Sequence, residues 1–177
     1  MKYLIASDIH GSLFFATQLF NQIQIENPDK VVLLGDLYYH GPRNPLTKDY
    51  NPKEVSNLLN SIADKIICTK GNCDAEVDQM ISNFKIIPHK KIKIAKKTVM
   101  FTHGHKFNID TPAENVDILI YGHFHTGFIQ EKNGQLFVNS GSVSLPKNNT
   151  ANSYLILDES GIYLKTLEGE IIDFHLF

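Results

Sequence analysis

Residues 2–10 read Lys-Tyr-Leu-Ile-Ala-Ser-Asp-Ile-His, an apolar run that ends in a carboxylate, Asp8, and an imidazole, His10. In an extended strand, side chains two positions apart lie on the same face. Such a strand would direct Asp8 and His10 toward one cation. The alternative is a buried strand leading into a capped helix, with an incidental aspartate and a hydrogen-bonded histidine. The residues downstream favour the metal site.

The first half of the chain alternates between strand and helix patterns. A helix is predicted from the N-cap Gly11-Ser12 to the stop signal Asn27-Pro28, with apolar residues at helical spacing between them. Asn51-Pro52 is typical of a second helix start, and this helix is predicted to continue to about Ala63. The alternating apolar runs predict strands within residues 2–10, 31–34 and 65–69.

The second half has a different pattern. Short apolar runs separated by lysines between residues 86 and 101 predict a β-meander rather than further strand–helix units. A short helix is predicted near Thr111-Pro112, and Asn133-Gly134 predicts a type I′ hairpin turn. Further strands are predicted at 116–121 and within 153–167. The predicted fold class is α/β, a two-sheet mixed β-sandwich flanked by helices, in a single domain spanning residues 1–177.

Composition excludes several classes of protein. With 177 residues and 42% hydrophobic content, the chain is long enough for one core and short for two. The net charge of −2, with scattered lysines and arginines, argues against nucleic acid or an anionic membrane as a stable partner. No apolar run approaches the roughly 20 residues of a membrane span, and the N-terminus lacks a signal-peptide pattern. We expect a cytoplasmic protein in which Cys68 and Cys73 are reduced thiols.

Seven polar side chains lie at or just past the ends of apolar runs. Ligands of open α/β sheets bind where strand ends converge, so we expect these side chains to meet. Two carboxylates, one amide oxygen and four imidazoles are too many for one tetrahedral ion. They suit two divalent ions if one carboxylate bridges them. The set comprises Asp8, His10, Asp36, Asn72, His103, His123 and His125.

These residues resemble the signature blocks of the calcineurin-like metallophosphoesterases, in the same order and over nearly the whole chain. The loop 40–44 and the block 71–78 are most similar to the YfcE-type bacterial phosphodiesterases of that family. The matching blocks are Asp8-Ile9-His10, Gly35-Asp36, Gly71-Asn72, His103-Gly104-His105 and Gly122-His123-Phe124-His125.

The resemblance implies a dinuclear-metal phosphodiesterase, in which a metal-bridging hydroxide attacks the phosphate diester in line. It implies catalytic roles for Asp36, Asn72 and His103. Manganese is the favoured metal, with iron, zinc or nickel as alternatives. The family pattern assigns Asp8, His10 and His125 to one metal, Asn72, His103 and His123 to the other, and Asp36 to both.

Four further residues are candidate substrate contacts. His40 and Arg43 lie in the long irregular loop 37–50 and could bind phosphate, and His105 could contact phosphate or a ligand histidine. Each is equally compatible with an ordinary loop residue. Many relatives have a histidine where this chain has Cys73, and a thiol is a poorer proton donor at neutral pH. This departure favours diesters with good leaving groups, although Cys73 could also be a space-filling residue.

Two alternatives to the phosphodiesterase remain open at this point. One is a protein-binding scaffold, but the retromer subunit that resembles this chain has asparagine and aspartate in place of Asp36 and Asn72. The other is a phosphomonoesterase or nuclease of the same superfamily, although the sequence shows no basic groove. The expected partner is a small phosphoester substrate. The sequence does not set the oligomeric state, and a homo-oligomer is compatible with it.

Overall fold

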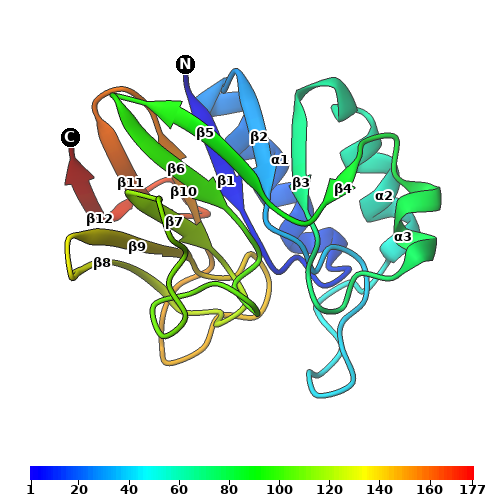
Figure 1. Ribbon diagram of the computed structural model, residues 1–177. Coiled ribbons are helices and arrows are strands. Elements are labelled where there is room, and N and C mark those ends of the chain that lie inside the picture. Colours follow the sequence, from blue (N-terminus) through cyan, green and yellow to red (C-terminus); the bar gives the residue numbers. More distant parts are fainter.

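Two β-sheets packed face to face form the centre of the computed structural model, which describes residues 1–177 (Figure 1). The mixed α/β two-sheet fold predicted from the sequence is confirmed. One sheet contains, in spatial order, β12 (Ile171–Leu176), β11 (Gly161–Thr166), β10 (Ser153–Leu157), β1 (Tyr3–Ala6), β2 (Lys30–Leu33), β3 (Ile66–Thr69) and β4 (Ile86–Ile87). The other contains β5 (Lys90–Ile94), β6 (Lys97–Phe101), β7 (Ile118–Tyr121), β9 (Gln135–Ser140) and β8 (Gly127–Lys132).

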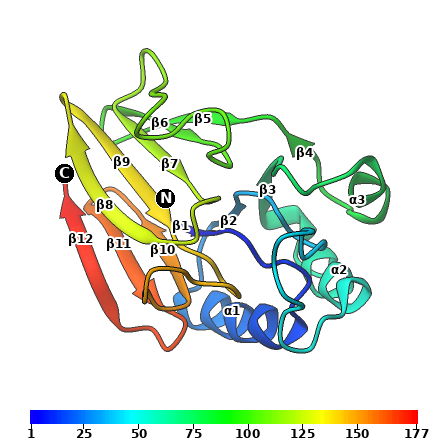
Figure 2. The same ribbon diagram turned by 90° about the horizontal axis from the view of Figure 1, so that it is seen from below.

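The central strands β1 and β2 are covered on both faces, as their uninterrupted apolar runs predict. Leu4 and Val31 pack in the apolar cluster that contains the helix residues, whereas Ile5 and Val32 pack in the cluster between the two sheets. This alternation follows from the two-residue period of a strand. Figure 2 shows α1 (Leu13–Glu26) and α2 (Pro52–Asn60) on the side of this sheet that faces away from the second sheet.

Both long helices start where the sequence predicts. The Ser12 hydroxyl accepts a hydrogen bond from the Phe15 backbone N–H, and the Asn51 side chain accepts one from Glu54 N–H. The second helix ends at Asn60, earlier than predicted, and a 3₁₀ turn follows at Ala63–Lys65. These caps fix where the chain leaves the strand ends and turns into each helix.

The predicted meander of the second half is wrong in part. β4 pairs parallel with β3 in the first sheet, and β6, β7 and β9 are parallel neighbours in the second. Only the pairs β5–β6 and β8–β9 are antiparallel within the second sheet. The turn between β8 and β9 has positive φ at both Asn133 and Gly134, as the predicted type I′ turn requires. Parallel pairing brings the carboxyl ends of neighbouring strands to the same edge.

The predicted helix near Thr111-Pro112 does not form. The Asn108 side chain accepts hydrogen bonds from the backbone N–H groups of Asp110 and Thr111, which favours a turn over a helix. This loop lies over one face of the second sheet, where a helix was expected. The apolar cluster there joins Phe107, Ile109, Ala113 and Val116 of the loop to Met100, Leu119, Tyr121 and Phe137 of the sheet.

Two elements were not predicted from the sequence. A short helix, α3 (Glu76–Ile81), follows β3, and the strand β12 forms one edge of the larger sheet. Both cysteines are free thiols, as expected. No helix combines the length and the apolar composition that crossing a lipid bilayer requires.

Candidate active site

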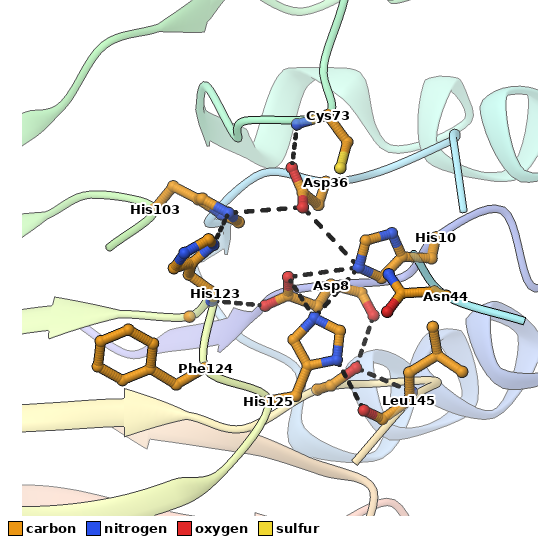
Figure 3. A network of polar contacts seen from close by, with 12 residues as sticks. Asp8, His10, Asp36, Asn44, Cys73, His103, His123, Phe124, His125 and Leu145 are labelled. Carbon is orange, nitrogen blue, oxygen red and sulfur yellow. Dashed lines mark hydrogen bonds and ion pairs between the residues drawn. The ribbon is translucent and has the colours of Figure 1, made fainter. Parts of the chain in front are cut away.

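All seven side chains of the predicted metal-binding set meet where strands of both sheets end (Figure 3). Three strands of the first sheet, β1, β2 and β3, and two of the second, β6 and β7, lead into this site. Because these strands run parallel within each sheet, the short segments after them converge at one edge. The segments supply Asp8 and His10, then Asp36, Asn72, His103, and finally His123 and His125.

Asp8, His10 and His125 form one group of donor atoms. The Oδ1 atom of Asp8 lies 3.2 Å from His125 Nε2 and 3.5 Å from His10 Nε2. The two Nε2 atoms lie 3.3 Å apart. All three side chains are buried, and their donor atoms lie within 4.8 Å of one another.

Asn72, His103 and His123 form a second group, and Asp36 lies between the two. His103 Nε2 lies 2.9 Å from Asn72 Oδ1 and 3.2 Å from His123 Nδ1. The Oδ2 atom of Asp36 lies 3.5 Å from His103 Nε2 and 3.8 Å from His10 Nε2. One carboxylate oxygen therefore faces a donor of each group.

The orientation of three imidazoles is fixed by hydrogen bonds on the side away from the site. In His10, His103 and His125, Nδ1 lies 2.7 to 2.8 Å from a backbone carbonyl oxygen. A carbonyl can only accept, so each Nδ1 carries a hydrogen and each neutral ring presents an Nε2 lone pair to the site. The accepting carbonyls belong to Tyr39, Leu34 and Leu145.

The donor atoms fit a bound cation. Asp8 Oδ1 is buried and accepts no hydrogen bond, although it faces two Nε2 atoms. Lone pairs of an oxygen and two nitrogens at this distance repel one another unless a proton or a cation lies between them. The mixture of carboxylate, amide and imidazole donors without a required thiolate suits first-row divalent metals.

The titration behaviour of the site follows from burial and close packing. Burial alone would raise the pKa of Asp8, but its contacts with His10 and His125 hold that pKa well below the ordinary value. The pKa of His10 is raised, because the Asp8 carboxylate outweighs the effect of burial. Burial and the neighbouring His103 lower the pKa of His123 to about 4. His123 is therefore neutral at pH 7, as a metal ligand must be.

The sequence analysis expected an extended strand through His10, and this expectation is wrong. The strand β1 ends at Ala6, and five donor residues have positive φ angles. A left-handed conformation costs an L-residue roughly 1–2 kcal/mol, so it persists only where surrounding contacts enforce it. The Asp8 carbonyl, for example, accepts hydrogen bonds from Ser142 Oγ at 2.8 Å and Ser144 Oγ at 3.1 Å. The five angles are 57° at Asp8, 48° at His10, 54° at Asp36, 66° at His123 and 59° at His125.

Glycines that precede two donors allow close approach of the backbone. A Cβ atom on Gly71 would lie 2.1 Å from Asp36 Oδ1. A Cβ atom on Gly122 would lie 2.0 Å from Ser7 Oγ and 2.6 Å from Asp8 Oδ2. Any side chain at either position would therefore displace a site carboxylate or its surroundings.

A buried carboxylate, Asp74, holds the loops after β2 and β3 together. It accepts backbone hydrogen bonds from Asp36 at 3.0 Å, Leu37 at 3.0 Å and Gly71 at 2.7 Å. Burial raises the pKa of Asp74 despite these bonds. Sequence reasoning did not predict this role, because the pattern does not show which backbone groups the side chain reaches.

The four candidate substrate contacts have different positions. Arg43 and Cys73 line an open cleft of about 970 Å³ above the donor atoms, whereas His40 and His105 do not. The His40 ring packs against Tyr39 and Tyr50. His105 is exposed, with its ring 5.5 Å from that of His103.

The thiol of Cys73 lies close to donor atoms of the site. Its Sγ atom belongs with His10 and Asp36 to a group of donors within 4.8 Å of one another. Burial and the nearby Asp36 carboxylate raise the pKa of Cys73 to about 12. The thiol is therefore protonated at neutral pH and is a weak acid.

Sequence reasoning missed most of the cleft lining. These residues come from separate loops and from β8, and no periodic pattern marks them. Only Phe124 had a signal, because it lies between two donor histidines in the sequence. The missed residues are Tyr39, Gly41, Pro42, Asn44, Phe124, Thr126, Phe128, Lys147 and Asn148.

The sequence also matches, over residues 1–161, the family described as the calcineurin-like phosphoesterase superfamily domain. The chain therefore belongs to the calcineurin-like phosphoesterase superfamily. It is 40% identical over 176 residues to phosphodiesterase YfcE of Escherichia coli strain K12, covering 97% of this chain and 95% of that protein.

Comparison with solved structures agrees with this assignment. The structure of E. coli YfcE superposes with a TM-score of 0.95 at 36% identity, covering 99% of each chain. A Vps29 variant from Entamoeba histolytica superposes with a TM-score of 0.68 at 22% identity, covering 100% of this chain and 99% of that one. At this identity, the likeness to Vps29 shows the fold alone.

Proposed function

We propose that this chain hydrolyses phosphate diesters with two divalent metal ions, manganese by preference. The observation that carries the proposal is the position of Asp36, whose Oδ2 faces a donor of each group. Asp8, His10 and His125 would hold one ion. Asn72, His103 and His123 would hold the other. The name and the near full-length similarity of E. coli YfcE support the diester as substrate.

Bound metal ions would supply Lewis-acid activation of water and of the phosphate ester. The protein's part is to hold its donors in place before the ions and substrate arrive. The Nδ1 hydrogen bonds of His10, His103 and His125 fix the tautomer and the ring orientation. The hydrogen bond from Cys73 N–H to Asp36 Oδ1, 2.8 Å, leaves Oδ2 free to face both groups.

The cleft offers no strong proton donor to a leaving group. Cys73 has a pKa of about 12, and the pKa of the exposed His105 is lowered, mainly by loss of solvation. Phosphate esters whose leaving group is a poor base need least protonation. We therefore propose aryl and nucleotide diesters as better substrates than alkyl monoesters.

The test uses bis(p-nitrophenyl) phosphate and p-nitrophenyl phosphate with manganese, after chelation and with Asp36→Asn. We expect hydrolysis of the diester that is lost on chelation, restored by manganese and strongly reduced in the variant. Diester hydrolysis that survives thorough chelation, or that is unaffected in Asp36→Asn, would contradict the proposal. Cyclic nucleotides and single-stranded DNA in the same assay distinguish a general diesterase from a nuclease.

The remaining sequence-based interpretations stay proposals. A single domain over residues 1–177 is supported by the shared cluster between the sheets, which joins Ile5 and Val32 to Val99 and Ile120. The free thiols agree with a cytoplasmic location. The scaffold alternative has only the fold of Vps29 in its favour, whereas the complete donor set favours an enzyme.

A further inference from the structure

Two cations in the cleft have no partner. Arg43 and Lys147 both line the cleft and are exposed, and neither side chain forms an ion pair or a hydrogen bond with the protein. The only carboxylate that lines the cleft is Asp36, which already faces His10 and His103. The walls therefore carry positive charge that the protein itself does not neutralise.

An apolar surface formed by two phenylalanines lines the same cleft. Phe124 and Phe128 each pack edge-to-face against the buried Tyr121, with ring centroids 5.8 Å and 6.0 Å away. The angles between the ring planes are 89° and 79°. Because Tyr121 is fully buried, it holds both rings in place before a ligand binds.

The aromatic and the cationic features lie on different sides of the donor cluster. Figure 3 shows Phe124 beyond His123, and Asn44, the neighbour of Arg43 in the chain, on the opposite side beside His10. Lys147 is tied to that opposite side, because its backbone N–H donates to the His125 carbonyl at 2.9 Å. A phosphate at the donor cluster would thus lie between an apolar and a cationic wall.

We propose that the preferred substrates are phosphodiesters with an aromatic ring on one side of the scissile phosphate and a second phosphate on the other. Nucleotide diesters with a terminal phosphate belong to this class. A diester phosphate has one negative charge, which the metal centre takes up, so Arg43 and Lys147 need a further anion. The aromatic ring packs on Phe124 and Phe128. The inference rests on the proposed function and narrows its substrate class.

The test compares two esters that differ in one phosphate. Thymidine 3′-phosphate 5′-(p-nitrophenyl phosphate) has the second phosphate, and thymidine 5′-(p-nitrophenyl phosphate) lacks it. In both, water cleaves the P–O bond to the aryl group and releases p-nitrophenol and the thymidine 5′-phosphate product. With the manganese-loaded full chain, we expect kcat/KM for the bisphosphorylated ester to be about tenfold higher or more.

Variants assign the selectivity to the two cations. Arg43→Gln combined with Lys147→Gln is expected to bring the ratio of the two kcat/KM values to about 1. Lys93→Gln is the matched control, because Lys93 is an exposed lysine on β5, outside the cleft. It is expected to leave the ratio unchanged. Phe128→Leu keeps apolar volume but removes the planar ring, and is expected to raise KM for both esters about threefold or more.

A ratio near 1 in the wild type, or a ratio that the double variant leaves unchanged, overturns the inference. The proposed function fails separately, if hydrolysis of both esters is insensitive to chelation. Calorimetry supplies a readout that does not depend on turnover. Thymidine 3′,5′-bisphosphate is expected to bind the wild type about tenfold more tightly than thymidine 5′-phosphate, and to lose this advantage in the double variant. Equal binding of the two nucleotides to the wild type contradicts the inference.

Discussion

The floor and the walls of the cleft are built in opposite ways. In the floor, formed by the seven donor residues, Asp8, His10, His103 and His125 are at most 3% exposed. Buried hydrogen bonds orient each of these four side chains or its backbone. In the walls, Arg43 and Lys147 are exposed and unpaired. The difference indicates that the floor is preorganised for one reaction, whereas the walls select among substrates.

The largest expected effect comes from breaking the floor at Asp36. Asp36→Asn keeps the shape but removes the charge that faces both groups of donors. We expect kcat/KM for bis(p-nitrophenyl) phosphate to fall by roughly 10³-fold, since metal-assisted charge stabilisation contributes several kcal/mol. Asp64→Asn, an exposed aspartate outside the cleft, is the control and should retain full activity. A loss below tenfold in Asp36→Asn would show that Asp36 is not central to the floor.

A smaller loss is expected at Asp74, which supports the floor from behind. Asp74→Asn replaces one of two accepting oxygens by an N–H donor, which opposes the N–H groups of Asp36, Leu37 and Gly71. We expect manganese affinity to fall about 10–100-fold, as for other residues that orient metal ligands. Metal titration followed by calorimetry measures this. Asp78→Asn is the matched control, because that buried aspartate bonds Ala75 N–H at the start of α3 and should leave manganese affinity nearly unchanged.

Cys73 lies at the boundary between floor and wall, and its side chain sharpens the comparison. With a pKa of about 12, its thiol is neither a thiolate nucleophile nor an effective acid at pH 7. Cys73→Ser is therefore expected to change kcat for aryl diesters by no more than about threefold. Steady-state kinetics across pH 6–9 check this. A loss of two orders of magnitude would place the thiol among the reacting groups.

The smallest effect concerns proton binding by the floor without metal. His123 has a pKa of about 4 in the folded chain, against an ordinary value of 6.5. Between these values the unfolded chain binds a proton at His123 and the folded chain does not, so this residue lowers stability as pH falls. In chelated protein, we expect His123→Gln to gain Tm relative to the wild type as pH is lowered from 7.5 to 4.5. A difference in Tm that is constant with pH would contradict the lowered pKa.

The floor could be predicted from the sequence, because each donor follows a short apolar run that is recognisable by composition. The walls could not, because Arg43, Phe128 and Lys147 lie far apart in the chain with nothing periodic to mark them. In the fold, the strands and both helix starts were predictable from local pattern and capping. The parallel pairing of β6 with β7 was not, because the connection between them is a loop stabilised by Asn108 rather than a recognisable crossover helix.

The left-handed backbone at five donor residues has a consequence for engineering. Glycine adopts this conformation without penalty, so replacement of Asp8 or His125 by glycine would relieve backbone strain while it removes a donor. Selection for heat resistance alone would favour such changes. The turns that carry the chemistry are thus the first that an unsupervised stabilisation of this protein would erode, and any thermostability screen should be coupled to an assay of metal binding.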